Sequence, residues 1–94
     1  VITLPNGIQG EILWFDSFGN AATNIIKSAV GEKNVSVFFD GRELPLFEHF
    51  AQMPADTLCA IWNSQGELEL VCRESSAREG FRIERGMRVD LLNN

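Results

Sequence analysis

The chain has 94 residues, enough for one small domain with a single core, and its 45% hydrophobic and 22% charged residues exclude a disordered chain. The formal net charge of -5, from 13 acidic and 8 basic residues, disfavours nucleic acid and anionic membranes as partners, because both are bound by clustered lysine and arginine. No apolar run approaches the roughly 20 residues of a membrane-spanning helix, and residues 1–5 do not resemble a signal peptide.

The first half of the chain predicts short strands separated by turns. Asp40-Gly41 is a strong signal for a two-residue hairpin turn, because both of its positions favour positive φ. In the return strand, Pro45 marks a sheet edge or a bulge. The expected elements are a strand at 8–15, a loop at 16–20, a strand or the start of a short helix at 21–26, a break at 31–34, and strands at 35–39 and 42–47.

The second half continues the pattern and sets the fold class. A serine is expected to cap a helical turn at 75–80 and Gly80 to end it. The other expected elements are an irregular or helical stretch at 48–56, strands at 57–62, 67–72 and 88–92, and a turn at 63–66. Regularly spaced short strands predict an all-β fold, a small antiparallel Greek-key-like β-barrel with one or two short helical turns. We expect residues 1–94 to form this one domain.

The hairpin of the strands at 57–62 and 67–72 has a predicted register. An even-length loop would place Ile61 opposite Leu68 and Cys59 opposite Leu70, with Thr57 opposite Cys72, all on the core face. Trp62 would then share the other face with Glu67, and the alternating Glu67 and Glu69 would lie on a solvated face.

The remaining single-residue patterns favour structural roles. Cys59 and Cys72 would lie diagonally across the hairpin, beyond ordinary disulfide reach, so free thiols and a cytoplasmic protein are expected. His49 is the one histidine and has no ligand partners nearby, so we expect no metal site. The aromatic residues expected in the core are Trp14, Phe38, Phe39, Phe47 and Phe50.

Three segments, in this order and spacing, resemble one family. They are Gly10 to Ile25, with Asp16, Phe18-Gly19-Asn20 and Thr23-Asn24-Ile25; Ile61 to Leu70, with the turn Asn63-Ser64-Gln65-Gly66; and the tail, with Ser75-Ser76-Ala77 and Glu84 to Val89. The chain is similar to the C-terminal domain of the S-adenosylmethionine hydroxide adenosyltransferases (adenosine-forming hydrolases), chlorinases and fluorinases. This resemblance implies a β-barrel that binds S-adenosylmethionine beside an N-terminal α/β domain.

The resemblance also implies roles for individual residues. Asp16 would hold the ammonium of the methionine part, and Asn20 would pair with the adenine edge, with Phe18 packed near the base. Ser64, with its turn neighbours Asn63 and Gln65, would bind the methionine carboxylate. The segment of Arg73, Glu74 and Ser75 would approach adenine, largely through its backbone.

The chain departs from the family pattern at three positions. Gln65 stands where some members have an arginine, Glu67 where an aromatic residue is common, and Arg73 where an asparagine is common. Trp62 would supply the missing aromatic ring across the hairpin. These departures lean away from the halogenating members of the family.

The function expected from the resemblance is that of a ligand-binding half-site. The chain begins at Val1 and not at methionine, so we expect a processed protein or the C-terminal domain of a longer two-domain parent. The parent would be a homotrimer in the cytoplasm, with the N-terminal domain of a neighbouring subunit completing the site. It would hydrolyse S-adenosylmethionine to adenosine and methionine without a cofactor, and the isolated chain would be inactive. The alternatives are a parent that uses halide, a structural barrel module without a ligand, and a barrel that binds another small ligand or an oligonucleotide.

Overall fold

A computed structural model describes residues 1–31 and 34–94 of the chain. The described residues contain one helix of α type and two of 3₁₀ type, α1 (Ala77–Phe81), η1 (Lys27–Ala29) and η2 (Phe50–Gln52). Their strands are β1 (Ile2–Leu4), β2 (Gly7–Phe15), β3 (Ala21–Ile26), β4 (Val35–Phe39), β5 (Arg42–Leu44), β6 (Leu46–Phe47), β7 (Leu58–Trp62), β8 (Glu67–Cys72) and β9 (Arg88–Asn93). Residues 32 and 33 of the predicted break at 31–34 lie outside the described residues. No helix in the described part is long and apolar enough to span a membrane.

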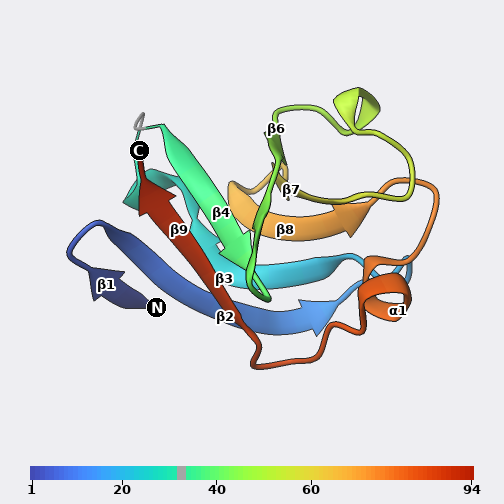
Figure 1. Ribbon diagram of the computed structural model, residues 1–94, viewed down its shortest axis with the longest axis horizontal. Helices are drawn as coiled ribbons and strands as arrows, with labels where there is room; N and C mark the ends of the chain where they lie inside the picture. The colour runs from blue at the N-terminus through green and yellow to red at the C-terminus, as the bar shows by residue number, and fades with distance from the viewer. Residues whose placement is uncertain (32–33) are drawn as a thin grey trace.

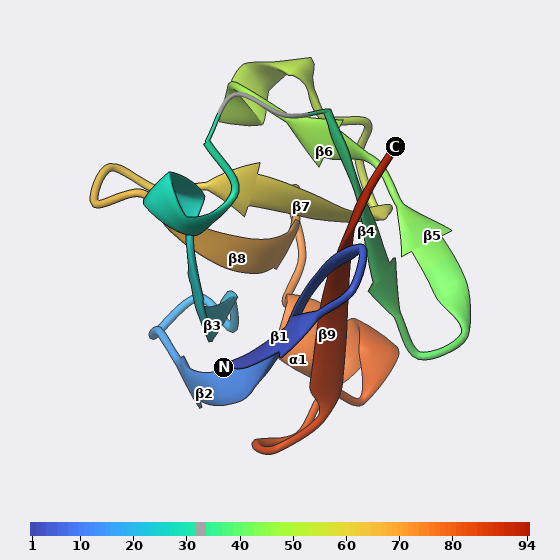
Figure 2. The same ribbon diagram turned by 90° about the vertical axis from the view of Figure 1, so that its left-hand side faces the viewer.

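The strands form a nearly closed barrel, which confirms the predicted fold class (Figures 1 and 2). The sheet order is β5-β4-β9-β2-β3-β8-β7-β6, and β1 pairs with the free side of β2 as an extension. Neighbours that are distant in sequence, such as β2 with β9 and β3 with β8, give the sheet its Greek-key character. The two ends of the sheet, β5 and β6, are joined through Pro45, so a single bent segment bridges the gap.

The pairing of β6 with β7 corrects the expectation of an entirely antiparallel barrel. These strands run parallel, with Leu46 opposite Ala60 and Phe47 opposite Ile61. Pro45 cannot donate a backbone hydrogen bond, so β5 ends there and the chain crosses to the other edge of the sheet. Its carbonyl accepts from the Ala60 amide at 2.9 Å, and this bond fixes the crossing.

The predicted register of the β7–β8 hairpin is wrong by one residue. Trp62 lies opposite Leu68 and Ala60 opposite Leu70, so residues 63–67 form an odd-length connection. Gly66, with a φ of 77°, supplies the extra residue, as in hairpins that add a left-handed glycine after a tight turn. Leu68 and Leu70 face the core as predicted, but Trp62 packs on the core side and not on the face of Glu67.

This register gives β7 and β8 two buried faces. One face joins the main core inside the barrel. The other carries Cys59 and Val71, which pack under Met53 from the segment between β6 and β7. Cys59 and Cys72 therefore lie on opposite faces and not diagonally on one, and both are free and buried, which confirms the expected thiols.

Several other predictions need correction. The expected turn at Asp40-Gly41 is confirmed, with φ values of 50° and 76°. However, α1 does not end at Gly80, because the left-handed residue after the helix is Arg82. Strand β1 was not predicted, although the turn signal of Pro5, Asn6 and Gly7 marks the hairpin that joins it to β2.

The aromatic residues divide between core and surface. Phe39 is buried, and Phe38 and Phe47 are partly buried. Trp14 and Phe50 were expected in the core, but their exposed fractions are 51% and 48%. Both lie where local pairing is irregular, Trp14 beside a shift of register in β2 and Phe50 in η2, so neither side chain follows the alternation of a regular strand.

The hydroxyl of Thr23 bridges two strands in the core and gives a first prediction. It donates to the Leu68 carbonyl at 2.8 Å and accepts from the Ile25 amide at 3.1 Å, with 2% of the residue exposed. Thr23→Val removes the hydroxyl, so the Leu68 carbonyl and the Ile25 amide both lose this bond, and the free energy of unfolding should fall by about 2 kcal/mol. Urea denaturation measures this loss, and Thr23→Ser, which keeps the hydroxyl, is the matched control. If the free energies of unfolding of Thr23→Val and of the unmutated chain differ by less than about 0.5 kcal/mol, the role of the hydroxyl is contradicted.

The buried thiol of Cys59 predicts a dependence of stability on alkaline pH. Burial raises the pKa of Cys59 above its ordinary value of 9.0, and the neighbouring Cys72 raises it further. The unfolded chain therefore loses this proton first as the pH rises, so the contribution of the thiol is complete below about pH 9 and is lost above it. The urea concentration at the midpoint of unfolding should fall between neutral pH and about pH 10.5. This fall should be steeper for the unmutated chain than for Cys59→Ala. Parallel curves for the two proteins would exclude this linkage.

Candidate functional site

The loop between β2 and β3 is closed by its own side chains. One carboxylate oxygen of Asp16 accepts from the amides of Phe18 and Asn20 at 2.9 and 3.0 Å. The other accepts from the side-chain amide of Asn20, also at 3.0 Å. The Asp16 amide in turn donates to the Asn20 carbonyl at 3.1 Å. The loop therefore holds Asp16 and Asn20 in fixed orientations and leaves Phe18 projecting, with 77% of its surface exposed.

Gly19 docks this loop against the start of α1. Its φ is 83°, and an added Cβ would meet the Ser76 hydroxyl at 2.0 Å, so only glycine fits. Ser76 caps α1 by accepting from the Glu79 amide at 3.2 Å, and the Arg78 amide donates to the Gly19 carbonyl at 2.9 Å. In Figure 1, α1 lies beside the end of the sheet at which β2 and β8 terminate.

A hollow of about 540 Å³ lies between this loop and the end of β8. Its exposed aromatic residues are Phe18 and Phe50. The other residues that line it are Asn20, Cys72, Glu74, Ser75 and Ser76. The structure thus brings together predicted site residues from two of the three motif segments. Phe50 was missed as a site residue, since its segment carries no motif.

Arg73 is placed differently from the residues on either side of it. Its guanidinium donates to the Met53 carbonyl at 2.8 Å, and its own carbonyl accepts from the Asp56 amide at 3.1 Å. These bonds fasten the segment that carries Phe50 to the end of β8. In this conformation Arg73 supports one wall of the hollow and does not line it.

The turn at residues 63–66 lies at the other end of the β7–β8 hairpin. The Asn63 side chain closes this turn by accepting from the amides of Gln65 and Glu67, each at 2.9 Å. Its amide group also donates to the carboxylates of Glu67 and Glu69, at 3.1 and 2.9 Å. Ser64 and Gln65 are exposed at its tip. Within the chain, this turn does not meet the hollow of Phe18 and Asn20.

Trp62 also lies away from that hollow. It lines a second depression of about 640 Å³, together with Lys27, Val35 and Glu48, at the end of the barrel that carries the C-terminus. This placement follows from the corrected register, because the ring points to the core side of β7.

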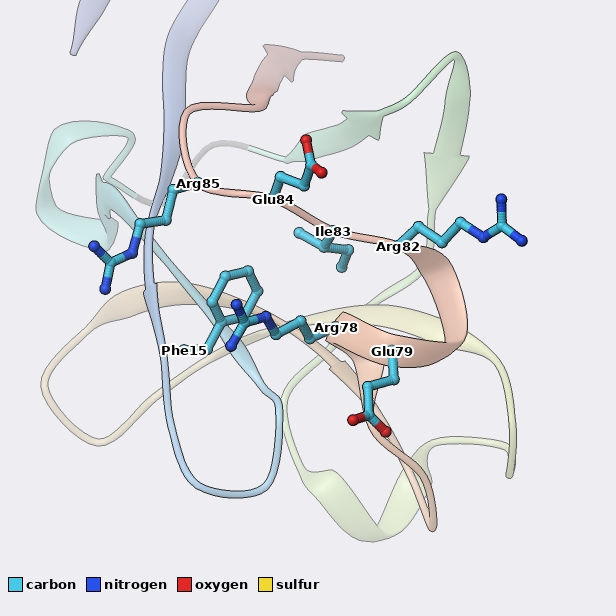
Figure 3. A pocket seen from close by; sticks show the side chains of 7 residues that line it. All are labelled: Phe15, Arg78, Glu79, Arg82, Ile83, Glu84 and Arg85. Carbon is cyan, nitrogen blue, oxygen red and sulfur yellow. The ribbon is translucent and has the colours of Figure 1, made fainter.

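A third hollow, of about 750 Å³, is an open groove between α1 and the approach to β9 (Figure 3). The Arg78 guanidinium lies 4.4 Å from the centre of the Phe15 ring, a cation–π contact. Figure 3 shows Arg82 pointing away from that ring, so the arginines of the groove do not converge on one point. Glu79 and Glu84 line the same groove, which further reduces its positive charge.

Metal binding has no support in the part of the chain that the structure describes. It contains no group of three histidine, cysteine, aspartate or glutamate side chains that could hold an ion. His49 instead caps η2 together with Gln52, whose side chain accepts from the His49 amide at 3.3 Å.

Comparison with known proteins shows which family the chain belongs to. Residues 10–90 match the family described as the SAM hydroxide adenosyltransferase C-terminal domain, where SAM is S-adenosylmethionine. The chain is 37% identical over 91 residues to the (R)-S-adenosyl-L-methionine hydrolase of Thermus thermophilus, and the match covers 97% of this chain and 34% of the relative. The chain therefore spans about a third of the length of this curated relative.

Two solved structures share the fold. A conserved hypothetical protein, also from Thermus thermophilus, superposes with a TM-score of 0.80 at 35% identity, over 97% of this chain and 39% of that one. An uncharacterized conserved protein from Thermotoga maritima superposes with a TM-score of 0.68 at 22% identity, over 97% and 40%. The second shows the likeness of fold alone. The chain belongs to the family of SAM hydroxide adenosyltransferase C-terminal domains.

Proposed function

We propose that this chain forms the adenosine-contacting half of the active site of a hydrolase that converts S-adenosylmethionine to adenosine and methionine. The observation that carries the proposal is the hollow in which Asn20 lies with Phe18 and Phe50, in a chain of this family. The proposal extends to a parent with an N-terminal α/β domain, which would complete the site from a neighbouring subunit of a cytoplasmic homotrimer. No cofactor is required, because S-adenosylmethionine is itself the substrate.

The Asn20 side chain is suited to an adenine edge. Its side-chain nitrogen donates one hydrogen to Asp16. Its second hydrogen and its side-chain oxygen have no partner in the described residues. An asparagine amide can donate to N7 of adenine and accept from the 6-amino group at the same time. The phenyl groups of Phe18 and Phe50 offer faces on which the base can stack.

The methionine part of the ligand would extend away from this hollow. The Asp16 carboxylate accepts three hydrogen bonds within its loop and has about four lone-pair sites, so it can still accept from an ammonium. Ser64, with Asn63 and Gln65, would then bind the carboxylate at the far end of the hairpin or through a partner subunit. Arg73 would support one wall of the site and not contact the base, and Trp62, which lines the other depression, would lie outside it.

The reaction would be a displacement at the C5′ carbon of the ribose. The water oxygen forms a bond to C5′ as the C5′–sulfur bond breaks, the electron pair of that bond returns to sulfur, and a proton is released. The sulfonium is already a good leaving group, so catalysis would consist of desolvating and aligning the water. Those groups would come from the N-terminal domain, so we expect no turnover by this chain alone. Water is favoured over halide because the 37% identical relative is named a hydrolase.

The role of Asn20 is testable in the isolated chain. Asn20→Ala should weaken binding of adenosine about tenfold, because both adenine bonds are lost. Chemical-shift titration by NMR follows binding even at millimolar affinity and reports the fold at the same time. Asn24→Ala is the matched control, because the Asn24 side chain bonds the Glu11 amide at 2.9 Å outside the hollow. Equal losses of adenosine affinity in the two variants, or no saturable binding of adenosine by the unmutated 94-residue chain, would favour a structural barrel module.

The aromatic wall gives a second test. Phe50→Ala should weaken adenosine binding about tenfold through lost stacking. It should change the free energy of unfolding by less than about 0.5 kcal/mol, because the side chain is half exposed. Trp14→Ala, an exposed aromatic outside the hollow, serves as the control and should leave binding unchanged. An unchanged affinity in Phe50→Ala would remove Phe50 from the site.

A further inference from the structure

The Ser75 hydroxyl belongs to a chain of three side chains at one wall of the hollow. It donates to the Asp56 carboxylate at 3.2 Å, and its oxygen lies 3.1 Å from the Cys72 sulfur. An ionised carboxylate can only accept, so the single hydrogen of the hydroxyl is the one that joins Ser75 to Asp56. The Cys72 thiol is then the donor to the Ser75 oxygen. The Asp56 carboxylate therefore sets the direction of both bonds.

This direction fixes what Ser75 can offer to a ligand. A serine hydroxyl has one hydrogen and two lone pairs. The hydrogen is used by Asp56 and one lone pair by the Cys72 thiol, so one lone pair is left. Ser75 is exposed and lines the hollow. Its hydroxyl is thus an acceptor toward a ligand and not a donor.

Backbone bonds hold both partners of this contact at the end of β8. The Asp56 amide donates to the Arg73 carbonyl at 3.1 Å, and Ala55 forms a parallel bridge with Arg73. The Ser75 amide donates to the Cys72 carbonyl at 3.3 Å. Asp56 has a φ of 56°, a left-handed conformation that aspartate adopts more readily than most residues. The carboxylate is therefore attached next to the hydroxyl that it orients.

The Asn20 side chain, on the loop that forms the other side of the hollow, is oriented by a carboxylate in the same manner. Its nitrogen donates to Asp16 at 3.0 Å, which fixes its oxygen as an acceptor for a ligand. The 6-amino group of adenine has two hydrogens to donate. In the proposed function the Asn20 oxygen accepts one of them, and the second remains for another acceptor of the hollow.

We propose that Ser75, oriented by Asp56, accepts this second hydrogen, so that the hollow selects 6-amino purines over 6-oxo purines. This inference rests on the proposed function and deepens it, since it names the group by which the base is distinguished. A 6-oxo purine such as that of inosine places an oxygen where the amino group would be, and its lone pair would face the lone pair of Ser75. A site built to accept from an amino group disfavours an analogue that lacks it. Asp56 acts through Ser75 and is a positioning residue.

The test is an NMR titration of the 94-residue chain with adenosine, inosine and purine riboside, which has a hydrogen in place of the 6-amino group. Ser75→Ala should weaken adenosine binding about fivefold, the usual effect of one hydrogen bond between neutral groups, and leave purine riboside unchanged. Asp56→Gly removes the carboxylate, and glycine keeps the left-handed conformation. The freed Ser75 hydrogen can then donate to the inosine oxygen, so the ratio of adenosine to inosine affinity should fall about fivefold.

Purine riboside separates this role from a structural one. If Ser75→Ala weakens adenosine and purine riboside equally, or weakens neither, the contact with the amino group is overturned while the proposed function stands. An unchanged ratio of adenosine to inosine affinity in Asp56→Gly overturns the orienting role of the carboxylate. Thr57→Val is the matched control, because it removes a hydroxyl that donates to the Ala55 carbonyl at 3.2 Å in the same segment but outside the hollow, and it should change none of the three affinities. If the unmutated chain binds none of the three nucleosides, the inference and the proposed function are both overturned.

Discussion

The close approach of Gly19 to Ser76 is the constraint on which the candidate site depends. A side chain at Gly19 would collide with the hydroxyl that caps α1, so the loop after β2 and the start of α1 can meet only through a glycine. Asp16 makes the same loop rigid, because its carboxylate accepts three bonds from within it. One glycine and one aspartate therefore fix the position of Asn20 relative to Ser75 and Ser76, which come from the end of β8, far later in the chain.

A second constraint acts from the opposite side of the hollow. The segment between β6 and β7 covers the outer face of the β7–β8 hairpin with Met53, and it is tied to β8 by the Arg73 guanidinium. That attachment brings Phe50 to the rim. The departure of Arg73 from the family pattern thus has a structural meaning, since a long cationic side chain at this position can reach a backbone carbonyl that an asparagine would not reach. The second wall of the hollow is built from a segment without any motif of its own.

The sequence allowed the fold class, most strand positions and two of the site segments to be predicted, and the failures have local causes. Alternation fixed the inward face of β8, because Leu68 and Leu70 alternate with glutamates. It could not fix β7, where almost every residue is apolar and both faces are buried, so the register depended on the length of the turn. That length is set by Gly66 in a left-handed conformation, and the sequence does not distinguish this from an even-length turn. Phe50 and Trp14 were misplaced in the core for a related reason, since an aromatic residue type alone does not reveal whether the side chain is buried or exposed.

The proposed function gives a reason for the two exposed phenylalanines of the hollow. Phe18 and Phe50 leave large apolar surfaces in water, which is unfavourable for a domain of this size unless the surface has a second use. A purine base of the proposed ligand can cover both rings. A stack on one side of the base contributes little while water has access to the other side. The same contacts strengthen when a second domain excludes water from the hollow. An open half-site with fixed polar groups is therefore what a reaction that depends on desolvation requires from this side of its substrate.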